Sequence, residues 1–99
     1  PETTLIRHAP TVSVSITGVV MDAETAPSTD FSLTLERINA ETRSVEKSQT
    51  VTLPGGSNRV FSQEVALEIT EEDLLVVSTA SGDEVKDTLS TLTVNLVVS

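Results

Sequence analysis

The chain has 99 residues, no cysteine and a formal net charge of −9. This length suits one small domain with a modest core, and the lack of cysteine excludes disulfide bonds and thiolate metal sites. The acidic balance disfavours nucleic acid and anionic membrane as partners, because both bind clustered Lys and Arg. No apolar run approaches the ~20 residues of a membrane span, so we expect no membrane insertion.

The first predicted element is an extended N-terminal arm, residues 1–10, bracketed by two prolines. An extended arm can add as a strand to the open sheet edge of a neighbour, and basic side chains in it suit an acidic partner such as a second copy. A disordered terminus is the alternative. The candidate partner-binding residues are the two apolar and two basic side chains of the arm, Leu5, Ile6, Arg7 and His8.

Apolar and polar residues then alternate at 12–17, at 31–36 and again at 92–96. Successive side chains of a strand point to opposite faces, so this pattern predicts antiparallel strands with one buried face. We expect the first two strands at about 11–21 and 31–38. Their inward residues are Val12, Val14 and Ile16 in the first, and Phe31, Leu33 and Leu35 in the second. Gly18 interrupts the first strand and marks a bulge or a close backbone approach.

The third strand, about 43–53, has Lys47 and Gln49 on its inward parity and is therefore expected at a sheet edge. The fourth, about 59–69, is predicted to bury Phe61, Val65, Leu67 and Ile69. The fifth, 74–79, is continuously apolar at first and is expected to be central. A turn at 81–84 leads to the sixth, about 88–98, with inward residues Leu92, Val94, Leu96 and Val98.

Short strands at this spacing, with turn signals between them, predict an all-β fold: a small antiparallel β-sandwich, Ig-like or transthyretin-like, of about six to eight strands. Residues 1–10 are then the arm, and 11–99 are a single sandwich domain. Residues 18–25, Gly-Val-Val-Met-Asp-Ala-Glu-Thr, resemble the first strand and turn of carboxypeptidase regulatory-like (transthyretin-like) sandwich repeats, which often read G-x-V-x-D-A-x-T. The resemblance implies a sandwich fold and no particular function.

The sequence contains few residues suited to catalysis. His8 is the only histidine and lies in the arm, whereas a Ser-His-Asp arrangement needs an imidazole held beside a serine. There is no cysteine nucleophile, no phosphate-binding glycine loop and no histidine-pair metal motif. We expect no catalytic residues and no cofactor.

Calcium is the one small ligand that the sequence suggests. If the strands run up and down, the loops after the first, third and fifth strands share one end of the molecule, and Ca²⁺ takes six to eight oxygens from such loops. The metal candidates are the acids Asp22, Glu24, Asp30, Asp83, Glu84 and Asp87. Acids that only face water are the alternative, since no D-x-D-x-D-G pattern occurs.

The sequence therefore favours a non-enzymatic structural or interaction protein, a repeated subunit of a larger assembly such as a capsid-decorating (cement) protein or another virion or surface protein. This setting rests on analogy between folds, and it implies a protein partner, self or a larger assembly, in a virion or extracellular location. The alternative is a Ca²⁺-binding or carbohydrate-binding module of a secreted protein.

Overall fold

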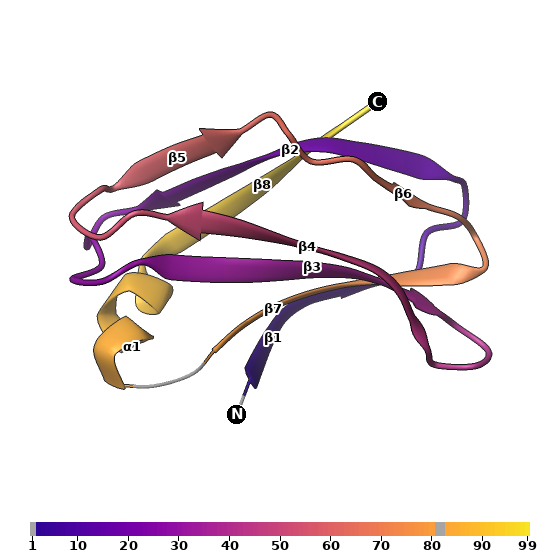
Figure 1. Ribbon diagram of the computed structural model, residues 1–99, viewed down its shortest axis with the longest axis horizontal. Helices are drawn as coiled ribbons and strands as arrows, with labels where there is room; N and C mark the ends of the chain where they lie inside the picture. The colour runs from indigo at the N-terminus through magenta and orange to yellow at the C-terminus, as the bar shows by residue number, and fades with distance from the viewer. Residues whose placement is uncertain (1, 81–82) are drawn as a thin grey trace.

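The computed structural model describes residues 2–80 and 83–99, which form two antiparallel sheets and one helix (Figure 1). The first sheet has the order β1-β7-β3-β4. The second has β2 at its centre, with β5 and β6 along one side and β8 along the other. The first sheet comprises β1 (Glu2–His8), β3 (Phe31–Asn39), β4 (Val45–Leu53) and β7 (Asp73–Ala80). The second comprises β2 (Val14–Ala23), β5 (Arg59–Ser62), β6 (Leu67–Ile69) and β8 (Leu92–Val98), and the helix α1 (Asp83–Ser90) precedes β8.

The two sheets pack face to face around an aliphatic core (Figure 1). The sequence predicted the inward faces of the first two alternating segments correctly for most positions. Phe31, Leu33 and Leu35 of β3 are buried, and Ile16 of β2 is buried opposite them. The predicted edge strand is β4, and the predicted central strand is β7, which lies between β1 and β3. The core consists mainly of Leu, Val and Ile side chains, of which the β-branched ones fit the pleated surface of a sheet.

Gly18 lies at a bulge, as its place in the alternation predicted. The pairing of β2 with β8 shifts register between Ile16 and Gly18, so one extra residue of β2 has no partner there. Without the shift, the alternation of the first half of β2 would expose Val19 and Met21, which are buried.

The prediction that Phe61 is buried is wrong, since its side chain is 51% exposed. The predicted strand 59–69 is two strands, β5 and β6, separated by residues 63–66. The interruption changes the parity of the inward face, so Leu67 and Ile69 are buried while Phe61 points to the outer face. Phe61 is paired with Val20 across the β2–β5 ladder.

The N-terminal segment is extended, as expected, but it does not leave the body as an arm. Residues 2–8 form β1 and pair with β7 along the edge of the first sheet. The first strand was predicted to begin after Pro10, because only three residues between the two prolines are apolar. The segment pairs with β7 although its apolar and polar residues do not alternate regularly. The register of this pairing shifts between Thr4 and Ile6.

The C-terminal part differs from the prediction in a second way. Residues 83–90, expected as a turn and the start of a strand, form α1, and β8 begins only at Leu92. Val12 and Val98 were both expected to face inward, but they are 66% and 55% exposed. Val12 lies before the start of β2, and Val98 is the last residue of β8.

Candidate functional site

One side of the molecule, where β4 lies over the segment between β5 and β6, is closed by side-chain hydrogen bonds. Lys47 Nζ donates to the carbonyl oxygen of Ala66 at 2.7 Å, and the backbone N–H of Ala66 donates to Gln49 Oε1 at 2.9 Å. Both polar backbone groups of Ala66 are thus satisfied from β4. The two inward polar residues that identified β4 as an edge strand therefore tie that edge to the opposite sheet.

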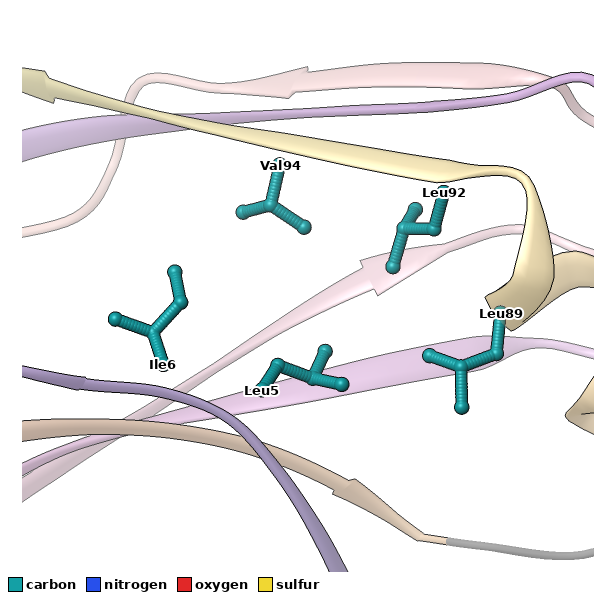
Figure 2. Close-up of a pocket in the computed structure, with 5 residues that line it drawn as sticks. All are labelled: Leu5, Ile6, Leu89, Leu92 and Val94. Carbon is teal, nitrogen blue, oxygen red and sulfur yellow. The ribbon is translucent and has the colours of Figure 1, made fainter.

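The opposite side, between β1 and β8, is open and apolar. A cavity of about 220 Å³ lies there between the two sheets and the helix (Figure 2). Its five lining side chains are only half-buried, although they pack against the core. We call this cavity the groove; it is lined by Leu5 and Ile6 of β1, Leu89 of α1, and Leu92 and Val94 of β8.

Leu5 and Ile6 both line the groove (Figure 2). In a regular strand two adjacent residues point to opposite faces, so only one of the two would line the groove. The register shift between Thr4 and Ile6 leaves Leu5 without an opposite residue in β7. A bulge of this kind re-aims a side chain, which gives the groove two adjacent aliphatic residues.

The helix α1 forms the end wall of the groove. Thr88 is buried, Leu89 faces the groove, and the hydroxyl of Thr91 after the helix accepts a hydrogen bond from the backbone N–H of Thr25 at 3.1 Å. The helix is therefore anchored to the loop that follows β2.

The strand β8 is the other wall and also an open edge. Among the described residues it pairs with β2 alone. Its sequence, LTVNLVV, contains neither charge nor proline, although sheet edges are usually protected from association by charges, prolines or bulges. The other edges carry such charges: Arg7 in β1, Glu46 and Lys47 in β4, and Arg59 in β5.

Apolar side chains continue from β8 onto the outer face of the second sheet. Phe61 and Val97 are exposed and flank Gly18, which leaves room for the Phe61 ring. Val98, at the end of β8, is exposed as well. The apolar surface therefore extends from the groove around the edge of β8 to this face.

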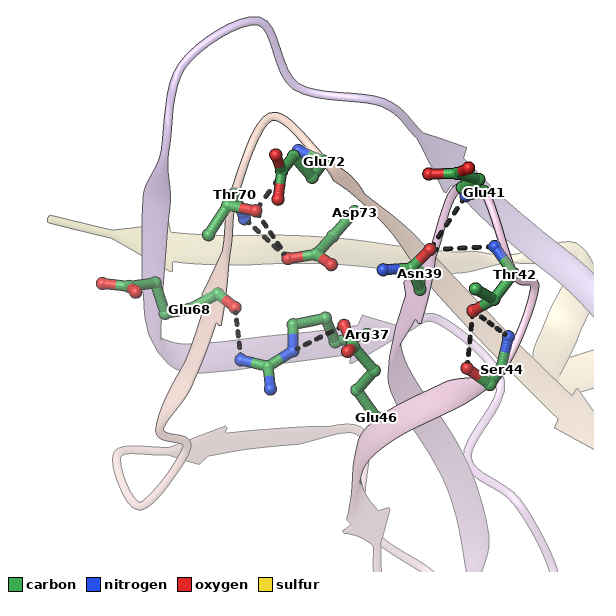
Figure 3. Close-up of polar contacts among 10 residues, drawn as sticks. All are labelled: Arg37, Asn39, Glu41, Thr42, Ser44, Glu46, Glu68, Thr70, Glu72 and Asp73. Atoms are coloured by element: carbon green, nitrogen blue, oxygen red, sulfur yellow. Dashed lines mark hydrogen bonds and ion pairs between the residues drawn. The ribbon is translucent and has the colours of Figure 1, made fainter.

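A charged cluster lies at the end of the molecule where β3, β4 and the turn before β7 meet (Figure 3). The pKa of Glu46 is raised, first by a hydrogen bond with the carboxyl of Asp73 and then by burial, and Arg37 Nε at 3.7 Å does not compensate. Burial acts to raise the pKa of Asp73 too. Hydrogen bonds from the N–H and hydroxyl of Thr70, at 3.0 and 2.9 Å, and from Glu46 outweigh it and lower that pKa.

This cluster links three segments of chain, although the side chain of Glu46 is 39% exposed. Arg37 also donates to the carbonyl oxygen of Glu68 at 3.2 Å, so β3 is linked to β6. Asn39 Oδ1 accepts from the backbone N–H groups of Glu41 and Thr42 and shapes the β3–β4 turn (Figure 3). A cavity of about 320 Å³ nearby is bordered by Arg37 and Lys47, whose cationic groups already bind backbone carbonyls.

The calcium candidates Glu24 and Asp30 lie in the loop between β2 and β3, which is hydrogen-bonded to the loop between β4 and β5. Gly56 N–H donates to the carbonyl oxygen of Pro27, and Asn58 Nδ2 donates to those of Ala23 and Glu24. The carboxylates of the calcium candidates do not form a metal site: among the described residues, no three His, Asp or Glu side chains are placed to hold a metal ion. Asp30 accepts from the N–H of Gly55 at 2.9 Å, Asp22, Glu24 and Asp87 are exposed, and the side chains of Asp83 and Glu84 lie outside the described part.

Of the four partner-binding candidates, the structure places two in the groove and two beside it. Leu5 and Ile6 line the groove, while Arg7 and His8 are exposed at the end of β1. Leu89 was not singled out from the sequence, and Leu92 and Val94 were predicted only as inward residues of the last strand. The spacing of apolar residues in 85–89, four apart as on a helix, was the signal that could have indicated α1.

Within the described residues, no helix has the length and apolar character needed to cross a membrane. Comparison of the chain with protein-family models, with curated proteins and with solved structures finds no match.

Proposed function

We propose that this protein is a non-enzymatic structural or interaction protein, a repeated subunit of a larger assembly, and that it binds its protein partner along the groove. The supporting observation is the difference between the two sides of the molecule. Lys47 and Gln49 bridge the two sheets with hydrogen bonds on one side, and the cavity beside them is lined partly by charged and polar side chains. On the other side, five half-buried aliphatic side chains line the cavity. Covering such side chains gains about 25 cal/mol per Å² of apolar area removed from water.

The charge of the chain supports a protein as the partner. A net charge of −9 repels nucleic acid and anionic lipid, but the groove itself is lined by aliphatic residues. Arg7 and His8 beside the groove suit an acidic partner.

The setting that fits such a subunit is a virion or extracellular assembly, with a capsid-decorating protein or another surface protein as the type. Small size, a strongly acidic chain and two packed antiparallel sheets favour it by analogy between folds. We place the two sheets in the β-sandwich class, Ig-like or transthyretin-like, on the same grounds.

Sedimentation velocity over a micromolar to millimolar concentration series tests this proposal. We expect the wild-type chain to associate and Leu89→Gln, which puts an amide into the groove, to weaken the association at least tenfold. Lys86→Gln is the matched control, because Lys86 is exposed on the same helix and does not line the groove. A wild-type chain that sediments as a single copy throughout, or equal association of the two variants, would contradict the proposal.

A further inference from the structure

We propose that the open edge of β8 pairs with β8 of a second copy of this chain, in antiparallel orientation, to form one continuous sheet across the two copies. The inference rests on the proposed function and names the partner at that site. The order of strands across the joint sheet would be β5/β6, β2, β8, and then β8, β2 and β5/β6 of the second copy.

The strand β8 is a sheet edge without the usual protection against association. In the described part of the chain it has one neighbour, β2. It is seven residues long, uncharged and free of proline, and the extra residue at the bulge belongs to β2. A long uncharged edge presents unpaired N–H and C=O groups that favour addition of another strand.

The distribution of charge also favours this edge. Two copies that each carry −9 repel one another. Like charges opposite each other in a ladder are destabilising, and β8 is the edge strand that brings no charge into the joint ladder. A second copy therefore meets the least repulsion there.

The two faces of β8 match those of a second β8 strand. Full overlap of two antiparallel seven-residue strands centres the pair on Asn95, which then lies opposite Asn95 of the second copy. Directly opposite residues share a face of the sheet, and this register places apolar residues together on the inner face. The inner pairs are Leu92 with Val98 of the second copy and Val94 with Leu96 of the second copy. The outer pairs are Thr93 with Val97 of the second copy and Asn95 with its counterpart.

This pairing also completes the groove. Leu92 and Val94 point from β8 towards Leu5 and Ile6 (Figure 2). Neighbouring strands lie ~4.8 Å apart, so Leu96 and Val98 of the second copy would stand beside Leu92 and Val94 over the open side. The exposed Val97 and Val98 would gain partners at the same time.

Cysteine cross-linking tests both the strand and the register, because the chain has no cysteine of its own. Opposite residues in an antiparallel ladder have Cα atoms ~4.5–5.5 Å apart, within disulfide range. We expect Asn95→Cys to form a disulfide-linked dimer under mild oxidation. Thr93→Cys and Val97→Cys should link poorly alone, since each lies ~14 Å from its counterpart, and efficiently when the two variants are mixed. All three positions are exposed, and circular dichroism checks the fold.

Ser48→Cys, on the exposed face of the other sheet's edge strand, measures random collision. If Asn95→Cys links no faster than Ser48→Cys, or if the mixture links no faster than its components, the inference is wrong. Association that persists in the wild type and is weakened by Leu89→Gln would then leave the proposed function standing, with a different segment in the groove. A wild-type chain that does not associate at all would remove both.

Discussion

Gly18 and Phe61 are complementary across the outer face of the second sheet. A Cβ atom on Gly18 would stand 3.1 Å from Cε1 of Phe61 and 2.9 Å from the carbonyl oxygen of Ser62. The aromatic ring thus occupies the space that the glycine leaves, an arrangement known to stabilise glycines in sheets.

We expect Gly18→Ala to destabilise the fold by about 1–3 kcal/mol, the usual cost of overpacking. The ring of Phe61 can move, but the backbone carbonyl of Ser62 cannot without disturbing the β2–β5 ladder. Urea denaturation measures the free energy of unfolding. The loss should persist when Phe61 is also replaced by Ala; full relief in that background would place the obstruction in the ring alone.

The two aromatic residues should differ in what they contribute. Phe31 is 1% exposed and Phe61 is 51% exposed. Truncation of a buried Phe costs ~3–5 kcal/mol, so we expect this range for Phe31→Ala and about 1–2 kcal/mol for Phe61→Ala, in proportion to the area it buries. Equal losses of unfolding free energy in the two variants would contradict the outward orientation of Phe61.

The Glu46–Asp73 pair should give a pH-dependent response. Because the folded state raises the pKa of Glu46, it favours the neutral carboxyl; that stabilising contribution is present below the unfolded pKa and lost as pH rises through the folded pKa. Glu46→Gln keeps a neutral donor beside Asp73, so we expect a higher melting temperature than the wild type at pH 7 and a smaller difference near pH 3. A lower melting temperature at pH 7 would show that attraction to Arg37 dominates instead.

Asp73 behaves in the opposite sense. Its pKa is lowered in the folded state, so its contribution is present above the unfolded pKa and is lost as pH falls through the folded pKa. Asp73→Asn weakens the acceptor for the N–H and hydroxyl of Thr70, and we expect a loss of about 1–3 kcal/mol at pH 7 that shrinks in acid. Thermal melts at both pH values check this; a loss that is the same at the two would show that the carboxylate charge is not involved.

The closed side should depend on Gln49. Gln49→Ala leaves the N–H of Ala66 without its side-chain acceptor, and we expect a loss of about 0.5–1.5 kcal/mol in denaturant titrations. Ser48→Ala on the neighbouring exposed position is the control and should change stability by less than about 0.5 kcal/mol. If Gln49→Ala and Ser48→Ala lose the same free energy of unfolding, the hydrogen bond from Ala66 to Gln49 does not hold this edge.

Strands with clear alternation were predictable, and departures came where the chain changes phase. In β3, Phe31, Leu33 and Leu35 follow an unbroken two-residue period and are buried as expected. Phe61 was assigned to the wrong face because residues 63–66 leave the ladder between β5 and β6. A shift of one residue in the register reverses the face of every later side chain in the strand. The local sequence does not show where such a shift occurs.

The groove was only half predictable for a related reason. Leu5 and Ile6 were predicted to bind a partner because they are apolar residues in a terminal segment. That both side chains line the groove depends on the bulge in the pairing of β1 with β7. Leu92 and Val94 face inward as predicted, and they are only half-buried because, among the described residues, β8 has one neighbouring strand. Which edges of a sheet stay open is set by the strand order, which is a property of the whole chain.

The central claim, that a second copy covers the edge of β8, is tested most directly by hydrogen exchange as a function of protein concentration. Strand addition would place the outward N–H groups of residues 92–98 in hydrogen bonds. We therefore expect exchange in this segment to slow as concentration rises, while exchange in residues 45–53 of the closed β4 edge stays constant. Exchange in 92–98 that is the same at every concentration, or slowing confined to 45–53, would contradict the account.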